Sequence, residues 1–136
     1  MHFLALFALA LSVVSCAAER AREADRPFTA GLASVESLEF EVRRLAPARA
    51  WVWVRGTLPD PCSALDSPHI QQTGSTFRIE LTTRRPFGAT CAQMPMPFER
   101  RIPLDVSAQV SGAYVVTVNG VTDNFAVNVL NPGPLY

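Results

Sequence analysis

The sequence predicts an all-β protein, an antiparallel sandwich of about seven strands, and three observations support this fold class. Eleven prolines, seven glycines and eight phenylalanines in 136 residues favour short elements joined by turns. Several segments alternate apolar with polar residues at the period of two that is typical of strands. No segment carries an amphipathic helix pattern long enough for a βαβ unit, so the elements are expected to be strands.

The first expected strand covers residues 34–43. Its Leu38, Phe40 and Val42 alternate with charged residues, so one face should be buried and the other should contact water. The segment before it, residues 16–33, begins with small and charged residues that have no apolar periodicity. We therefore expect this segment to be a flexible tether.

The second expected strand covers residues 48–57 and is apolar on both sides. Trp51 and Trp53 share one face, and Val52 and Val54 share the other. A strand of this kind is expected in the centre of a sheet, and we assign the two tryptophans to the core.

Five further strands are expected from the same alternation and from the turn residues between them: 68–72, 75–83, 97–106, 112–118 and 121–130. The pair Asn119-Gly120 predicts a type I′ hairpin between the last two, because these residues accept the positive φ angles of that turn. A two-residue loop would place Val116 opposite Asp123 on an apolar face, whereas a longer loop would avoid this conflict. Both loop lengths remain open.

The N-terminus indicates export. Residues 3–14 are uncharged and almost wholly apolar, which is too short for a membrane-spanning helix of about 20 residues but has the length of a signal-peptide core. The segment Val13–Cys16 resembles the lipobox of bacterial lipoproteins, which implies that residues 1–15 are a lipoprotein signal peptide and that Cys16 is lipidated. An ordinary signal peptide, cleaved one or two residues after the cysteine, is the alternative. The folded domain is expected over residues 34–136.

The cysteine count fits both interpretations. Lipidating or removing Cys16 leaves Cys62 and Cys91, an even pair that can form one disulfide in an oxidising compartment. Ala17 follows the cysteine at a position where lipoproteins retained in the inner membrane usually carry aspartate. In a Gram-negative host we therefore expect an outer-membrane location.

Composition and motifs exclude several function classes. Twelve arginines balance twelve acidic residues, and a nucleic-acid binder would be expected to carry a basic excess. Ser63 and Asp66 lie near His69, but this proline-bounded stretch has no nucleophile-elbow pattern, so we predict no catalytic residues. Without the signal peptide, the chain holds one histidine, His69. A single histidine without spaced partners cannot complete a transition-metal site, and we expect no metal or cofactor.

Two features are candidates for surface contacts. The segment Met94–Phe98 contains Met94, Met96 and Phe98 between prolines, and we interpret it as a loop that contacts a partner. Three arginine pairs could bind an anion if the strand order gathered them, but adjacent strand residues face opposite sides. We therefore expect these arginines to form scattered surface ion pairs. The pairs are Arg43-Arg44, Arg84-Arg85 and Arg100-Arg101.

The segment Gly112–Tyr114 resembles the G-x-Y segment of immunoglobulin-like domains, in which the tyrosine hydroxyl returns to the backbone at a corner. A tyrosine that merely fills the core is the alternative. Cys62 and Cys91 do not stand at the inter-sheet positions of antibody domains, so the likeness extends to a similar sandwich architecture at most.

Residues 52–130 also resemble an uncharacterised group of small secreted or lipid-anchored bacterial proteins. The residues that carry the likeness are Gly56–Cys62, Leu81–Pro86, Cys91, Pro103–Val106 and Gly112–Gly120. The resemblance implies a β-sandwich with one disulfide and brings no catalytic residues.

These observations together predict a non-enzymatic, lipid-anchored protein of the bacterial cell envelope. Its partners would be the membrane, through the lipid on Cys16, and an unidentified envelope protein. The alternative is a freely secreted binding or inhibitor-like module that uses the Met94–Phe98 loop.

Overall fold

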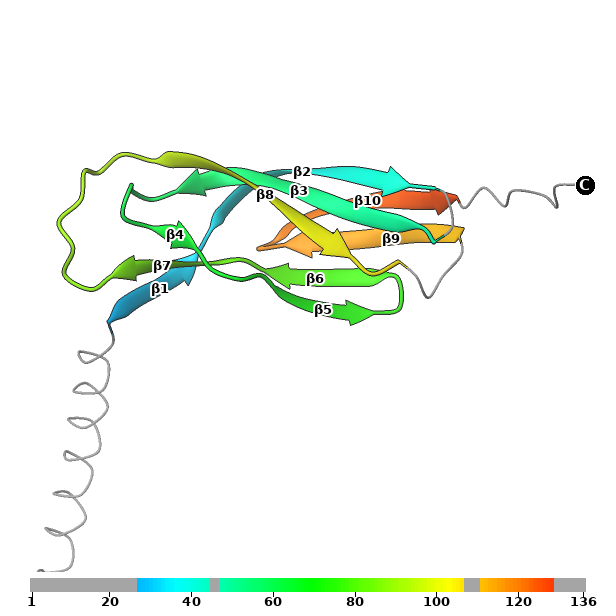
Figure 1. Cartoon of the computed structure of the whole chain (residues 1–136), viewed down its shortest axis with the longest axis horizontal. Helices are drawn as coiled ribbons and strands as arrows, with labels where there is room; N and C mark the ends of the chain where they lie inside the picture. Colours follow the sequence, from blue (N-terminus) through cyan, green and yellow to red (C-terminus); the bar gives the residue numbers. More distant parts are fainter. Residues whose placement is uncertain (1–26, 45–46, 107–110, 129–136) are drawn as a thin grey trace, which may run out of the picture.

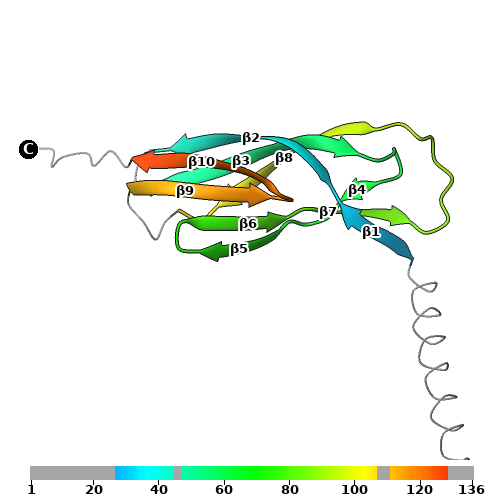
Figure 2. The same cartoon turned by 180° about the vertical axis from the view of Figure 1, so that it is seen from behind.

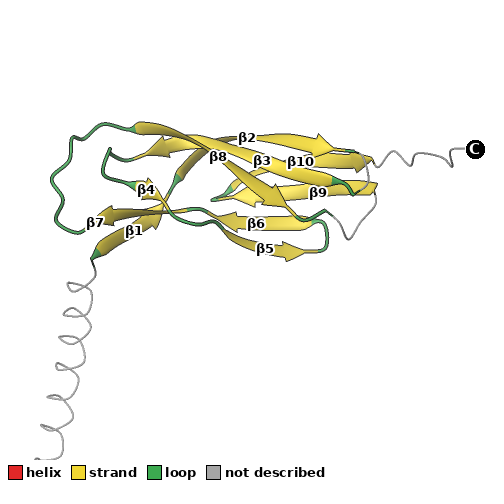
Figure 3. Ribbon diagram, viewed as in Figure 1, coloured by secondary structure: helices red, strands yellow, loops and turns green. Residues whose placement is uncertain are grey.

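The computed structural model describes residues 27–44, 47–106 and 111–128, and these residues form ten strands in three sheets (Figure 1). The strands are β1 (Phe28–Leu32), β2 (Ser34–Arg43), β3 (Arg49–Leu58), β4 (Ala64–Leu65), β5 (His69–Thr73), β6 (Thr76–Glu80), β7 (Thr82–Pro86), β8 (Met96–Leu104), β9 (Ser111–Val118) and β10 (Val121–Asn128). Loops and turns join them, and the described residues contain no helix (Figure 3).

The two larger sheets form the sandwich. One has the strand order β2-β3-β8 and the other β10-β9-β6-β5. A third, small sheet of order β1-β7-β4 continues the molecule at the end where residue 27 enters, and β10 ends at the opposite end (Figures 1 and 2). The all-β sandwich predicted from the alternation pattern is therefore confirmed.

The core lies between the inner faces of the two larger sheets. Its fully buried side chains are Val52, Val54, Phe77, Ile79, Leu81, Ile102, Val106, Tyr114, Val116, Val118 and Val127. They come from both sheets and from the segments where the chain leaves them, so they form one hydrophobic core.

The strand pairing departs from a purely antiparallel sandwich at one place. Strand β6 pairs with β9 in parallel, with Phe77 opposite Val116, while every other described pair is antiparallel. A parallel pair needs a crossover connection, and the chain supplies it by passing through β7 and β8 in the other two sheets.

Each of the seven expected segments contains a strand, but the structure divides one of these segments and adds the strands β1 and β4. The segment 75–83 is divided at Leu81 into β6 and β7, because the chain crosses there from the four-stranded to the small sheet. Strand β4 has only two residues. Strand β1 lies within residues 16–33, so the predicted tether is wrong at its C-terminal part. Residues 16–26 lie outside the described residues.

The β9–β10 hairpin has the two-residue loop. Asn119 has a φ of 46° and Gly120 a φ of 90°, as the type I′ turn requires. Asp123 pairs with Val116, which is the register that the longer loop would have avoided. The charge is tolerated because β10 is an edge strand and Asp123 is exposed.

The two tryptophans are not in the core. Val52 and Val54 form the inner face of β3, and Trp51 and Trp53 lie half-buried on its outer face. The prediction that β3 is central was correct, since β2 and β8 flank it. The assignment of the tryptophans to the core was wrong, because their face of β3 is the outer one. There the guanidinium of Arg101 covers the indole rings, 4.1 Å from the centroid of Trp51 and 5.6 Å from that of Trp53.

Tyr114 combines the two roles that the sequence left open. Its ring packs in a row of aromatic side chains, 6.0 Å from Phe77 and 5.2 Å from Phe125 between centroids. Its hydroxyl donates a hydrogen bond of 3.5 Å to the carbonyl of Val106, eight residues upstream. Burial and the nearby carboxylate of Asp105 raise the pKa of this phenol.

Asn119 also holds the places where the chain changes sheet. Ala33 separates β1 from β2, and Leu81 separates β6 from β7. The Asn119 side chain accepts a hydrogen bond from the Leu81 N–H at 2.9 Å and donates to the carbonyls of Ala33 and Leu81, both at 2.8 Å. One amide thus provides partners for backbone groups where the sheet pairing is interrupted.

We expect Asn119→Gly to lower the free energy of unfolding by about 2–3 kcal/mol, because glycine keeps the positive φ but leaves the backbone groups of Ala33 and Leu81 without the amide. Urea unfolding measures this loss. Asn119→Ala should be less stable still, since it adds backbone strain. A glycine variant as stable as the parent protein would contradict the role of the amide.

Candidate functional site

The end of the molecule that carries the small sheet is braced by the disulfide. Cys62 and Cys91 are bonded, with their Cα atoms 6.1 Å apart and 29 positions apart in the chain. Oδ1 of Asp60 accepts the backbone N–H groups of Cys62 and Ser63, both at 2.9 Å, and the Ser63 hydroxyl at 3.0 Å. The side chain of this aspartate therefore closes the turn that presents Cys62.

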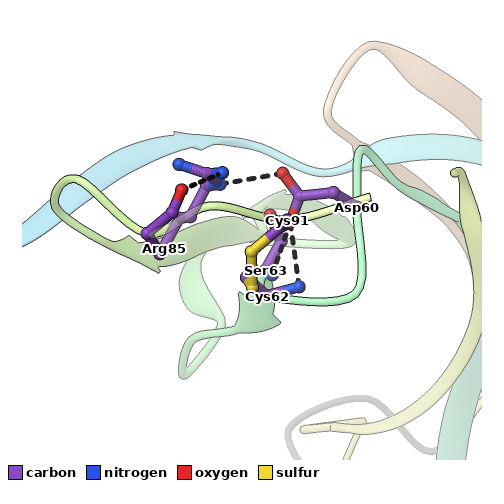
Figure 4. Close-up of a disulfide and its surroundings, with 6 residues drawn as sticks. Asp60, Cys62, Ser63, Arg85 and Cys91 are labelled. Carbon is purple, nitrogen blue, oxygen red and sulfur yellow. Dashed lines mark hydrogen bonds and ion pairs between the residues drawn. A yellow bond between two sulfur atoms is a disulfide. The ribbon is translucent and has the colours of Figure 1, made fainter. Parts of the chain in front are cut away.

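Arg85 connects this turn to the next loop (Figure 4). Its Nε donates to Oδ2 of Asp60 at 2.8 Å, and its Nη2 donates to the carbonyl of Ala89 at 2.7 Å. Partial desolvation of the Asp60 carboxylate acts to raise its pKa, but the hydrogen bonds from Ser63 and Arg85 outweigh this and leave the pKa below its ordinary value. The Asp60 carboxylate is therefore charged at neutral pH and pairs with the guanidinium of Arg85.

Residues 87–95 form the loop between β7 and β8. Gly88 has a φ of 71°, and the Ala89 N–H donates to the carbonyl of Pro86 in a turn at the start of the loop. The Phe87 N–H donates to the carbonyl of Pro27 at 3.0 Å, which joins the loop to the start of β1. With Arg85 and the disulfide, these contacts fix the loop along much of its length.

Four large apolar side chains are exposed on this loop and on β1. Their exposed fractions are 46% for Phe28, 64% for Leu32, 61% for Phe87 and 54% for Met94. We call these four residues the apolar end. Phe28 and Leu32 share one face of β1 with Ala30, and the guanidinium of Arg84 lies 5.7 Å from the Phe28 ring on the adjacent strand.

The sequence identified only part of this surface. Met94 is exposed as predicted, but Met96 and Phe98 belong to strand β8 and not to a loop. Both are half-buried, and Phe98 packs against the core beside Gly56. The alternation of Phe28 and Leu32 was the signal for the missed part.

The residues considered for catalysis are not arranged as a triad. The Ser63 hydroxyl donates to Asp60, and Asp66 accepts the N–H of Ser67. His69 begins the exposed edge strand β5, and its Nε2 lies 3.4 Å from the amide nitrogen of Gln71. His69 is thus a surface residue on an edge strand.

Within the described residues, one group brings three potential metal-ligand atoms within 4.8 Å of one another: Asp60, Cys62 and Cys91. The two sulfur atoms are bonded to each other and so do not offer thiolate ligands. The described ranges contain no helix that is long and apolar enough to cross a membrane. Cys16, the predicted lipidation site, lies outside them.

The outer face of the β2-β3-β8 sheet is a second ordered surface. Arg101 donates to both carboxylate oxygens of Glu41 on β2, and Trp53 Nε1 donates to the same carboxylate at 3.3 Å. Arg55 bridges a glutamate on each neighbouring strand in the same way. These charges pair with one another and are therefore less available to a ligand. We take the apolar end as the better candidate for a contact surface.

Comparisons with known proteins agree with the fold. A family model described as "ORF11 beta-sandwich domain" matches residues 52–127. The chain is 33% identical over 89 residues to a protein of Herpetosiphon aurantiacus named "Uncharacterized 10.2 kDa protein in HgiCIIM 5'region", covering 65% of this chain and 94% of the relative. It is 36% identical over 77 residues to the "Uncharacterized 10.2 kDa protein in HgiBIM 5'region" of the same organism, covering 57% and 93% of the two chains. No solved structure matches.

Replacing both Cys62 and Cys91 with serine should lower the free energy of unfolding by about 2–5 kcal/mol, because the bond restricts the unfolded chain by closing a loop of about 30 residues. Denaturant unfolding followed by far-UV circular dichroism measures the loss, and the signal of the folded variant should remain β-rich. An unchanged midpoint would show that the bond contributes no stability.

Proposed function

We propose that this chain, which belongs to the ORF11 beta-sandwich domain family, is a non-enzymatic protein of the bacterial cell envelope. A lipid on Cys16 holds it at the membrane, and its apolar end contacts another envelope protein. The observation that carries the contact is the exposure of Phe28, Leu32, Phe87 and Met94 on β1 and on the β7–β8 loop.

Exposed apolar residues that gather on one surface are typical of interaction sites. Scattered single residues are normal and need no partner, but these four lie on β1 and on a loop that is hydrogen-bonded to its start. The disulfide and Arg85 hold this loop before any partner binds. A surface fixed in this way loses less conformational entropy on binding.

The proposed anchor, Cys16, is close in sequence to β1 of the apolar end. Eleven residues separate Cys16 from Phe28, and this segment spans at most roughly 40 Å when fully extended. A lipid on Cys16 would therefore keep the apolar end, and not the opposite end of the sandwich, close to the membrane. Partners in or at the membrane would meet that end first.

A non-enzymatic role agrees with the hydrogen bonds of the polar residues. The Ser63 hydroxyl is engaged by a carboxylate that also holds the turn, and His69 stands on an exposed edge. A contact role agrees with the fixed geometry of the loop. The second candidate, a freely secreted module, would use the same loop through Met94, which is exposed at 54%.

Metabolic labelling with a palmitate analogue tests the anchor. We expect the parent protein to be labelled and to fractionate with membranes, and Cys16→Ala to be unlabelled, because the thioether to diacylglycerol needs the cysteine sulfur. The double variant Cys62→Ser/Cys91→Ser is the control and should keep its label. Equal labelling of parent and Cys16→Ala would contradict lipidation at this residue, and parent protein in the soluble fraction would favour the secreted module.

Site-specific photocrosslinking tests the contact surface. A benzophenone side chain placed at Phe87 or Met94 should form crosslinks to a defined envelope protein in intact cells, because these side chains are exposed on a fixed loop. The matched control positions are Ile70 and Val115, which are apolar and exposed at 38% and 39% on other strands. Equal crosslinking from all four positions would show that the apolar end has no special role.

A further inference from the structure

The hairpin between β2 and β3 gathers three arginines. Arg43 and Arg49 are the last directly opposed pair of the two strands, and Arg44 follows at once in the chain. Together with Pro47 these residues line an open hollow of about 370 Å³. We call these four residues the arginine pocket. It lies at the end of the sandwich opposite to β1 (Figure 1).

The three arginines of the pocket form no ion pair with another described residue. The nearest acid across the sheet is Asp105, which follows Leu104, the partner of Ala50, and so stands beside Arg49. The ion pairs formed among the described residues involve Arg55, Arg85 and Arg101, and none includes Arg43, Arg44 or Arg49. The closest outer-face carboxylate along β2, Glu41, already accepts hydrogen bonds from Arg101 and Trp53. All three arginines of the pocket are exposed.

This arrangement is unfavourable for the isolated protein. Directly opposed residues in an antiparallel pair have Cβ atoms about 4.5–5.5 Å apart, and like charges at such positions destabilise the sheet. The chain has enough acidic residues to pair with every arginine, since it holds twelve of each and its net charge is zero. A bound anion would remove the repulsion between Arg43 and Arg49.

We propose that the arginine pocket binds a phosphate monoester. A carboxylate carries one charge and is satisfied by one guanidinium, whereas a phosphate monoester carries a charge of about −1.5 to −2 and three acceptor oxygens. Three arginines therefore supply enough positive charge for both negative charges of the monoester, and enough hydrogen-bond donors for its three oxygens. Arg43 also lies 5.4 Å from the ring centroid of Trp51, which restricts where its guanidinium can lie.

The expectation that the arginine pairs form scattered surface ion pairs is correct only in part. Arg85 and Arg101 form ion pairs as the sequence predicted, but Arg43 and Arg44 do not. The partner of Arg43 in the pocket is Arg49, which is not a member of any sequence pair. The register of the β2–β3 hairpin brings these two together.

Calorimetric titration of the full chain in a nonionic detergent at low salt tests the site, with methyl phosphate as the probe. We expect saturable binding to the parent protein, and binding at least about tenfold weaker for Arg43→Gln/Arg49→Gln, because each lost charge-assisted contact is of that order. The matched control is Arg78→Gln/Arg100→Gln, which removes two other exposed arginines and should bind as the parent does. Dimethyl phosphate and acetate, which carry one charge, should bind more weakly than methyl phosphate.

Several results would overturn the proposal. These are no saturable binding, equal losses in the pocket and control variants, or equal binding of methyl and dimethyl phosphate. A melting temperature of Arg43→Gln/Arg49→Gln well below that of the parent would also overturn it, because the two arginines would then serve the fold; we expect no decrease without ligand. Vesicles of phosphatidylcholine with phosphatidic acid distinguish the source of the monoester, since binding to them as well as to methyl phosphate would point to a lipid headgroup.

Discussion

The architecture depends on satisfying backbone groups where two long stretches of chain leave one sheet for another. The breaks at Ala33 and Leu81 interrupt the ladders of hydrogen bonds, and unpaired backbone groups near a core are costly. The two breaks satisfy some of each other's backbone groups, because the Ala33 N–H donates to the Leu81 carbonyl at 2.9 Å. The Asn119 amide completes the arrangement, so the β9–β10 turn, the core and the small sheet are joined at one point.

This junction determines where the surfaces lie. It lets β1 and β7 extend beyond the sandwich and pair with each other, which carries Phe28 and Phe87 away from the core. The same extension brings Arg85 to Asp60 and gives the disulfide a fixed turn to hold. At the other end, the β2–β3 hairpin stays within the sandwich, and its strand register sets the arginine pocket. The molecule thus has an apolar end near its N-terminal segment and a basic end far from it.

The outer face of the β2-β3-β8 sheet shows why apolarity alone does not assign a strand face. Both faces of β3 are apolar in sequence, yet the side that faces the other sheet carries Val52 and Val54, which are buried in the same core as Ile102. The wider indole rings of Trp51 and Trp53 are instead covered by an arginine from β8. Arg101 can do this because the hydrocarbon part of its side chain and its planar guanidinium both stack on aromatic rings while its charge pairs with Glu41.

Local physical rules were sufficient for much of the fold. Alternation located β2 at residues 34–43 without error, the Asn119-Gly120 pair gave the hairpin because few other residues accept its φ angles, and cysteine parity gave the disulfide. Tertiary structure decided everything that depended on which strands become neighbours. It divided the segment 75–83 between two sheets, turned part of an expected tether into β1, paired β6 with β9 in parallel, and placed Arg49 opposite Arg43. Such contacts join residues far apart in the chain or set a register by packing, and no local pattern contains that information.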